Sequence, residues 1–494
     1  MTLSSLLSER AKKYSGRVCI KYKDRKLSFS EIDNLVSLTA GGLGSLGLKN
    51  SDRVAILMEN CPEYIVSCFA ILRAGGIAVP VNTFLTTDEI SYILQDSGCR
   101  ILIYGRKYSS HIEKLKKDIP DLKAITFKDI PLLEAEPYSG NSDEVAVLLY
   151  TSGTTGFSKG AMLTHSNLIS NAEAGAKVIN VSHRDKILLF LPLFHSFSLT
   201  VCVILPIFSG ATIFLLESVK PFSRVINSIF RDRITLFIAV PTIYNILSKK
   251  RMPFFLRLIF KLLINIRACI SGAAALPEAT IHAFEARFKI PLLEGYGLTE
   301  TSPIVSVNPL NGVRKPGSVG PPVPGVEVKV VGDDRKDLPS GEMGELAVKG
   351  HNVMKGYFNR DEETRESLKD NWFYTGDMAK IDEDGYIYIV DRKKDLIIVD
   401  GMNIYPREVE DFVMEHDSVE ECAMVGVPDG RGSELTVLYL KKAEDAVIDD
   451  NEIRAYLKGQ LAQFKIPKRI RFIEDLPKTA TGKIKKAELR KWKL

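Results

Sequence analysis

The sequence lacks the long apolar segments that mark membrane-spanning or secreted chains. No stretch reaches about eighteen apolar residues without a charge, so we expect no transmembrane helix. The residues from Met1 to Tyr14 are polar and amphipathic and contain no apolar signal core, so we expect no secretory signal peptide. These absences favour a cytoplasmic protein.

Cysteine pairs with the spacing of a metal site or of a redox motif are absent as well. The number of cysteines is odd, and we expect reduced, mostly buried thiols at seven positions: Cys19, Cys61, Cys68, Cys99, Cys202, Cys269 and Cys422. The net charge of +5 is spread along the chain, so it gives no indication of a nucleic-acid partner. An anionic cofactor accounts for this charge equally well.

The 494 residues have a globular composition and suggest roughly three domain-sized units. Up to about residue 300, helical and strand-like segments alternate, which predicts an α/β fold with parallel sheets flanked by helices. We expect Ser30 to cap a helix over Glu31–Leu46. Further helices are expected over Pro62–Ala74 and Thr87–Ser97, and strands over Arg53–Met58, Gly76–Val81, Arg100–Tyr104, Val145–Leu149, Lys186–Leu191, Ala211–Leu215, Leu236–Val240 and Arg267–Ser271.

The residue pattern of the sequence changes after about residue 305. Several prolines interrupt helices there, and short alternating strands follow over Glu327–Val331 and Glu345–Lys349. This pattern predicts a small β-barrel or antiparallel sheet over about 306–391. A charged joint, Asp391–Asp395, separates it from a compact α+β unit over residues 395–494.

One segment, Lys249–Arg267, combines a strongly apolar helical pattern with interspersed bases. Such a helix suits the surface of an anionic membrane, which would give the protein a peripheral contact with the inner face of a membrane. The same pattern suits a helix packed on the core with a basic edge. Both interpretations stay open from the sequence.

The most informative segment is the Tyr150–Gly160 loop, with the sequence Tyr-Thr-Ser-Gly-Thr-Thr-Gly-Phe-Ser-Lys-Gly. It follows the apolar run Val145–Leu149, so it reads as a loop after a buried strand. Glycines let backbone N–H groups turn toward one point, hydroxyl groups add donors, and Lys159 adds positive charge, which together suit a polyphosphate. The position of Lys159 before Gly160 excludes a Walker A loop.

Five further motifs follow in order: Leu191–Phe197 around His195, Gly295–Glu300, Asp370–Asp377, Asp391–Pro406 and Pro477–Lys483. Together they resemble the adenylate-forming (AMP-binding) superfamily of acyl-CoA synthetases, luciferase-like enzymes and peptide-synthetase adenylation domains. The resemblance covers residues 25 to 485 and is greatest to fatty-acyl-CoA ligases. It implies that ATP and a carboxylic acid form an acyl-adenylate, from which coenzyme A displaces AMP. It also implies an N-terminal domain over 1–391, a hinge at 392–394 and a mobile C-terminal domain over 395–494.

The resemblance also implies roles for particular residues. Lys483 would hold the carboxylate against the α-phosphate, and Glu300 would hold Mg²⁺ together with Thr154. Nucleotide contacts are expected from Thr151, Ser152, Gly153, Thr154, Thr155, Gly156, Lys159, Gly272, Ala273, Ala274, Tyr296, Gly297, Thr299, Asp377 and Arg392. Lys394 would be the hinge residue, Gly401 would lie along the pantetheine, and His195 would stand between the acyl pocket and the thiol tunnel.

The substrate is less well specified than the reaction. No Asp occurs between Ile187 and Glu217, which disfavours an amino-acid substrate because its ammonium group would lack a partner. The absence of a side chain at Gly297 is read as room for a medium or long acyl chain, with Phe197, Val240, Pro241, Gly272 and Ala273 as an apolar wall. Aryl and succinylbenzoate-type acids remain alternatives. A carrier protein remains an alternative acceptor, and a binding protein without turnover a third hypothesis.

Overall fold

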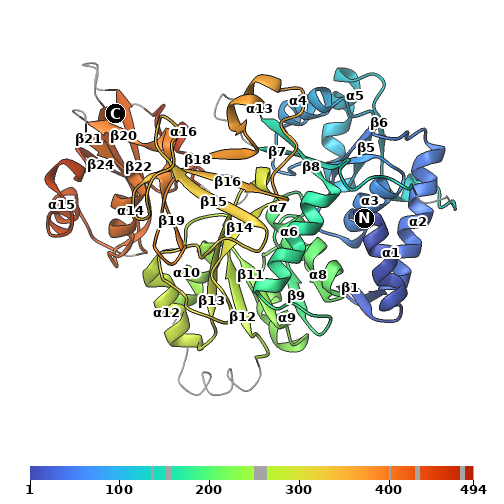
Figure 1. The fold of residues 1–494 in the computed structure, drawn as a ribbon, viewed down its shortest axis with the longest axis horizontal. Coiled ribbons are helices and arrows are strands. Elements are labelled where there is room, and N and C mark those ends of the chain that lie inside the picture. Colours follow the sequence, from blue (N-terminus) through green and yellow to red (C-terminus); the bar gives the residue numbers. More distant parts are fainter. Residues whose placement is uncertain are drawn as a thin grey trace.

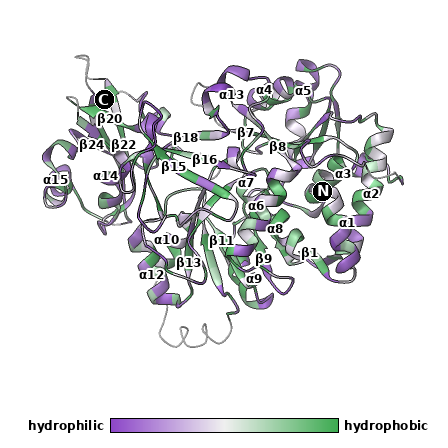
Figure 2. Cartoon of the chain, in the orientation of Figure 1, coloured by the Kyte–Doolittle hydropathy of each residue, from purple (hydrophilic) through white to green (hydrophobic). Residues whose placement is uncertain are grey.

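The computed structural model describes residues 1–134, 138–151, 158–249, 264–399, 402–428, 434–444, 446–478 and 484–492. The chain is built on two large sheets, a curled antiparallel sheet and a separate C-terminal unit, which lies at the left of Figure 1. Figure 2 shows hydrophobic residues concentrated on the inner strands and hydrophilic residues along outer helices such as α13 and α15. The α/β fold class expected from the alternating segments is confirmed.

The first large sheet has six strands in the order β6-β5-β3-β4-β7-β8. Most pairs are parallel, and the last strand, β8, runs antiparallel to β7. The strands form because short aliphatic runs alternate with helical segments that cover both faces. Their bounds are β3 Arg53–Leu57, β4 Ile77–Pro80, β5 Ile101–Tyr104, β6 Lys123–Ile125, β7 Val145–Thr151 and β8 Lys159–Thr164, with helices α3 Pro62–Arg73, α4 Thr87–Ser97 and α5 Ile112–Asp118.

The second large sheet has eight strands in the order β14-β13-β12-β11-β9-β10-β1-β2. Its central strands are fully buried and read as continuous apolar runs, as expected for parallel strands covered on both faces. Their bounds are β1 Val18–Tyr22, β2 Arg25–Ser28, β9 Lys186–Leu189, β10 Thr212–Leu215, β11 Leu236–Ala239, β12 Ala268–Ser271, β13 Leu292–Gly297 and β14 Ile304–Val307. The helices of this part are α1 Leu3–Lys13, α2 Phe29–Ser45, α6 His165–Val178, α7 Ser196–Leu199, α8 Leu205–Ser209, α9 Phe222–Arg231, α10 Pro241–Lys249 and α12 Glu278–Phe288, with a π-helical turn, η3, over Thr200–Ile204.

The curled sheet carries β15 Val326–Val331, β16 Gly344–Gly350, β17 Leu368–Lys369, β18 Trp372–Ile381 and β19 Ile387–Arg392, all paired antiparallel. Helix α13, Asp361–Ser367, precedes β17. The C-terminal unit has a three-stranded sheet and a short hairpin with its own helices. Its elements are β20 Ile397–Val399, β21 Met402–Ile404, α14 Pro406–Met414, β22 Val419–Pro428, β23 Glu434–Lys442, α15 Asp450–Lys458, β24 Arg469–Phe472 and α16 Lys486–Leu489.

One element boundary differs from its prediction. The expected cap at Ser30 is wrong, because helix α2 begins at Phe29 and Ser28 is its N-cap. Ser28 has an extended backbone, its hydroxyl accepts from the N–H of Glu31, and the Glu31 carboxylate accepts from the Ser28 N–H in return. Apart from the Lys249–Arg267 segment, the other expected helices and strands agree with the structure to within two residues at each end.

The Lys249–Arg267 segment lies largely outside the described residues, so its two interpretations are not distinguished. In the described part of the chain, no helix is long and apolar enough to cross a membrane. Six of the seven cysteines are buried and Cys61 is half-buried, as expected for structural thiols. Burial raises the pKa of Cys61 to about 12, so this thiol stays protonated.

Candidate active site

A pocket of about 570 Å³ opens where the two large sheets meet the curled sheet. Ten sequence-predicted site residues line it: Thr151, Lys159, His195, Gly272, Ala273, Tyr296, Gly297, Thr299, Glu300 and Arg392. They come from the ends of β7, β12, β13 and β19, from the start of β8, and from loops between elements. The carboxyl ends of strands are where open α/β sheets commonly place ligands.

Other predicted residues are placed differently. Ala274 is exposed and Lys394 belongs to a short turn after β19, and neither lines the pocket. Asp377 is buried directly behind the pocket wall, where the lining residue Tyr296 contacts it. Ser152, Gly153, Thr154, Thr155, Gly156, Gly401 and Lys483 lie outside the described residues.

Tyr296, Asp377 and Arg392 form a connected polar group at one side of the pocket. The Tyr296 hydroxyl donates to Asp377 Oδ2 at 2.5 Å, and Arg392 Nε lies 3.1 Å from Asp377 Oδ1. Burial, and the charge of Asp377, raise the pKa of Tyr296 well above its usual value, so the hydroxyl keeps its proton. A carboxylate accepts up to about four hydrogen bonds, so Asp377 retains capacity for the two hydroxyls of a ribose.

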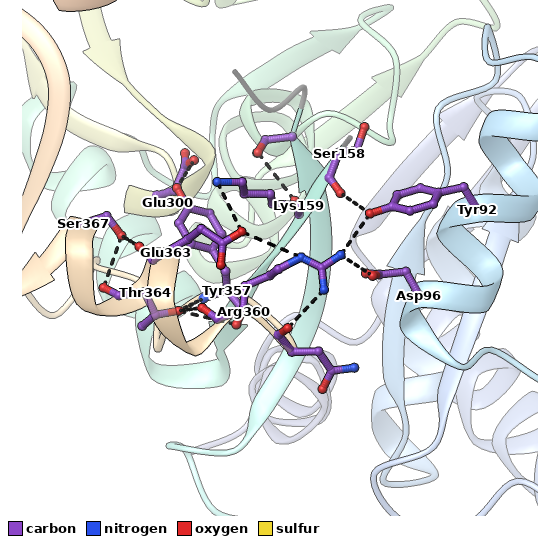
Figure 3. Close-up of polar contacts among 12 residues, drawn as sticks. Tyr92, Asp96, Ser158, Lys159, Glu300, Tyr357, Arg360, Glu363, Thr364 and Ser367 are labelled. Atoms are coloured by element: carbon purple, nitrogen blue, oxygen red, sulfur yellow. Dashed lines mark hydrogen bonds and ion pairs between the residues drawn. The ribbon is translucent and has the colours of Figure 1, made fainter. Parts of the chain in front are cut away.

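Lys159, near the end of the Tyr150–Gly160 segment (the expected phosphate loop), and Glu300 lie on either side of Tyr357 (Figure 3). The Tyr357 hydroxyl donates to Glu300 Oε1 at 2.9 Å, and Lys159 Nζ lies 5.6 Å from the centre of the Tyr357 ring. Lys159 Nζ is also 3.7 Å from Glu363 Oε1. These groups fit a triphosphate with its metal, because the Lys159 ammonium can pair with phosphate oxygens, and a single carboxylate such as Glu300 suits Mg²⁺ that takes its other ligands from phosphates and water. The described residues contain no cluster of three or more metal-binding side chains.

A group of polar side chains close to Ser158 was not predicted from the sequence. Arg360 Nη2 lies 2.8 Å from Asp96 Oδ1, and the Tyr92 hydroxyl donates to the carbonyl of Ser158 at 3.2 Å (Figure 3). Tyr150 donates to the other oxygen of Asp96 at 2.7 Å. Arg360 and Asp96 are 264 residues apart, so no local spacing could reveal the pair. Their proximity follows from the backbone of residues 355–358, which is hydrogen-bonded to β8.

His195 is half-buried and lines the pocket as the N-cap of α7. Its Nδ1 accepts from the N–H of Phe197 at 3.2 Å, so the neutral ring carries its proton on Nε2. This hydrogen bond restrains the plane of the ring.

Gly297 does not report on the room in the pocket, which corrects the sequence interpretation. A Cβ at this position would lie 1.9 Å from the carbonyl oxygen of Pro303, so the close approach of the β14 backbone requires glycine. Gly272 is different, because a Cβ there would meet ring atoms of Phe197, at 3.0 Å, rather than backbone. Phe197, Gly272 and Ala273 line the pocket as expected, whereas Val240 and Pro241 do not.

The pocket is lined by charged residues from one set of elements and by uncharged, mostly aliphatic residues, called here the apolar wall, from another. The charged lining residues come from β8, β16, α13, β19, the turn between β13 and β14 and the turn before β16: Lys159, Glu300, Arg335, Glu345, Glu363, Glu366 and Arg392. The residues contributed by α6, η3, β12 and β14 carry no charge: Gly175, Ile179, Val201, Ile270, Ser271, Ile304, Ser306 and Val307. An aliphatic or aromatic group of a substrate could therefore be buried against these uncharged residues, with no unpaired charge of the protein facing it.

Comparison with known proteins agrees with this geometry. The AMP-binding enzyme family model matches residues 7–358, and the AMP-binding enzyme C-terminal domain matches residues 408–483. A long-chain-fatty-acid–CoA ligase of Bacillus subtilis is 35% identical, over 99% of this chain and 94% of the relative. A feruloyl-CoA synthase of Amycolatopsis is 34% identical, over 99% and 98%.

The solved structures include ATP-bound MatB from Rhodopseudomonas palustris, with a TM-score of 0.92 and 32% identity over 99% of this chain and 98% of that one. Acyl-CoA ligases of this family use ATP, Mg²⁺ and coenzyme A. The family match extends over most of the chain, and Thr151, Lys159, Tyr296 and Glu300 line one pocket, with Asp377 hydrogen-bonded to Tyr296 directly behind it. The chain therefore belongs to the AMP-binding enzyme family, as an acid–thiol ligase that acts through an acyl-adenylate.

Proposed function

We propose that the protein ligates a medium- or long-chain fatty acid to coenzyme A. The observation that carries this proposal is the apolar wall formed by α6, η3, β12 and β14. A fatty acyl chain needs an extended apolar surface and no polar partner beyond its carboxylate. The similarity to a long-chain-fatty-acid–CoA ligase supports the same substrate class.

In the first step, the proposed roles follow from the charge that develops at the phosphates. Lys159 and the loop before it neutralise the leaving pyrophosphate, and Glu300 holds Mg²⁺ with Thr154. Asp377 and Arg392 bind the ribose, with the adenine beside Tyr296 and the backbone of Gly272, Ala273 and Ala274. Lys483 holds the substrate carboxylate against the α-phosphate.

In the second step, we propose that the C-terminal domain, residues 395–494, rotates about a hinge at 392–394. This rotation removes Lys483 from the pocket and brings the Gly401 segment to the thiol, with His195 at the junction of acyl pocket and thiol tunnel. Ion pairs of the hinge residue Lys393 support placing the boundary between the two domains here. Lys393 Nζ lies 3.0 Å from Asp333 and 3.2 Å from Glu345, both in the N-terminal domain.

An aryl acid or a succinylbenzoate-type acid is the second candidate substrate. The Phe197 ring packs against Gly272 inside the pocket, which suits stacking on an aromatic substrate. The similarity to a feruloyl-CoA synthase supports this candidate. A carrier protein is the alternative acceptor to coenzyme A.

The deciding experiment measures pyrophosphate release from ATP and Mg²⁺ with straight-chain acids of increasing length, two aryl acids and succinylbenzoate. Each acid is tested with and without coenzyme A. Coenzyme A-dependent turnover that peaks at one fatty-acid length establishes the proposed substrate, and a peak on an aryl acid replaces it. Pyrophosphate release with no response to coenzyme A points to a carrier-protein acceptor.

The two-step mechanism predicts that Lys483→Ala separates the half-reactions. Adenylate formation should fall by at least about a hundredfold, because the charge that holds the carboxylate is lost. Thioester formation from supplied acyl-adenylate should remain close to the wild-type rate. Equal loss of both half-reactions would contradict the role assigned to Lys483.

A further inference from the structure

Glu363 is a carboxylate that lines the pocket and has no role in the two proposed reaction steps. It lies in α13, and its Oε1 is 3.7 Å from Lys159 Nζ and 3.9 Å from Arg360 Nε (Figure 3). Neither distance is that of a hydrogen bond, so Glu363 stands between two cations and is tightly bound to neither. The Lys159 side chain is 16% exposed and that of Glu363 is 32% exposed.

The two cations differ in how firmly they are held. Arg360 is anchored by Asp96 Oδ1 at 2.8 Å and by the Tyr92 hydroxyl at 3.1 Å, and its other terminal nitrogen donates to a backbone carbonyl. Lys159 begins β8 directly after the phosphate loop, and its ammonium group faces the pocket. Lys159 is therefore the partner that can leave Glu363, whereas Arg360 stays in place beside it.

A carboxylate beside the phosphate loop opposes the binding of a polyphosphate, because like charges repel in a half-buried site. We propose that Glu363 is a positioning residue that acts as an exchangeable counter-ion of Lys159. It holds the ammonium group toward the pocket before nucleotide binds. When a triphosphate or pyrophosphate enters, Lys159 pairs with the phosphate oxygens and Arg360 retains Glu363. When pyrophosphate leaves, Lys159 returns to Glu363.

This inference rests on the proposed role of the phosphate loop and adds a consequence for product release. Glu363 competes with pyrophosphate for Lys159, so it weakens the binding of ligands with β- and γ-phosphates and favours the departure of pyrophosphate. A partly exposed pair of this kind has a modest strength, so its removal should change affinity about threefold to tenfold. AMP lacks both distal phosphates, so its affinity should not change.

The test compares Glu363→Gln with Glu362→Gln, which removes the same charge from the same helix turn at an exposed position. Binding of Mg²⁺-pyrophosphate, Mg²⁺-ATP and AMP is measured by calorimetry on the full chain. Glu363→Gln should bind pyrophosphate and ATP about threefold to tenfold more tightly, with AMP unchanged. It should also show stronger product inhibition by pyrophosphate. Glu362→Gln should match the wild type for all three ligands.

Unchanged or weaker pyrophosphate binding in Glu363→Gln would overturn the proposal, and so would an equal change for AMP, which would indicate a structural effect. Glu363→Ala gives a second variant with the same expected direction, should the amide disturb α13. Failure of the wild-type protein to bind either pyrophosphate or ATP would instead contradict the proposed function, so the two failures are distinguishable.

Discussion

At the scale of single residues, Asp377 connects the pocket to the curled sheet. Its two oxygens are held by Tyr296 and Arg392, and its side chain is almost fully buried. Asp377→Asn should weaken ATP and AMP binding by about tenfold or more, because charge-assisted hydrogen bonds to a ribose are worth about 1.5–3 kcal/mol. Calorimetry measures both affinities. Asp382→Asn is the matched control, since Asp382 pairs with Lys315 and does not line the pocket.

Glu294 is a buried residue whose charge should make stability depend on pH. It is 2% exposed in β13 and accepts from the N–H of Leu276 at 3.0 Å. Burial raises the pKa of Glu294 to about 7. The folded state therefore binds more protons than the unfolded state between about pH 4.5 and pH 7. The stabilisation that comes from this raised pKa is fully present below about pH 4.5 and is lost as the pH rises through about 7.

Glu294→Gln removes this dependence, because the amide stays neutral and still accepts from Leu276. Between about pH 5 and pH 8, the wild type should lose about 2 kcal/mol of unfolding free energy relative to the variant. Urea unfolding at the two pH values measures it. Glu278→Gln, at an exposed carboxylate of α12, provides the comparison. A difference that is the same at both pH values would contradict the raised pKa.

At the scale of elements, helix α2 depends on its N-terminal cap. Ser28 and Glu31 satisfy each other's backbone N–H groups, so Ser28→Ala should lower stability by about 1 kcal/mol. Asn34→Ala is the control, because Asn34 is an exposed residue of the same helix that lies beyond its N-terminal cap. Thermal unfolding measures both variants. An equal loss in both would show that the cap hydrogen bond is not the cause.

At the scale of the whole molecule, the C-terminal unit has hydrophobic clusters of its own. Among the residues that the structure describes, these clusters contain only residues from Ile397 onward, and the other three clusters contain none of those residues. Within this unit, Lys486 Nζ lies 2.7 Å from Glu410 Oε1, and both side chains are 16% exposed. The pair joins α16 to α14, close to the segment that carries Lys483.

Lys486→Met should therefore destabilise the C-terminal unit alone. Glu410 would keep its hydrogen bond from the N–H of Met424 but lose its cation in a mostly buried position, which should cost about 3 kcal/mol. Calorimetry should show a lower transition for the C-terminal unit and an unchanged transition for residues 1–391. Lys458→Met, at an exposed position of α15, is the control. A joint shift of both transitions would mean that the two parts unfold as one unit.

The predicted site residues that lie in or beside the pocket share one property. Each lies in a short local motif whose residue types are typical of one kind of chemistry. Lys159 belongs to a glycine-rich loop, and Asp377 follows a glycine. The Arg360–Asp96 pair has no such signal, because its members come from α4 and from the segment before α13. The interpretation of Gly297 failed for a related reason. A missing side chain can serve a ligand or a neighbouring backbone, and only packing distinguishes the two.

The sequence by itself determined the order of helices and strands, the fold class and the reaction family, since these depend on local periodicity and on motifs a few residues long. The tertiary structure alone decided which charges meet. Glu363 reaches Lys159 because residues 355–358 are hydrogen-bonded to β8, and the apolar wall arises because α6 and β14 pack together. Such contacts join residues far apart in the chain, and their energies depend on burial and distance, which no sequence pattern records.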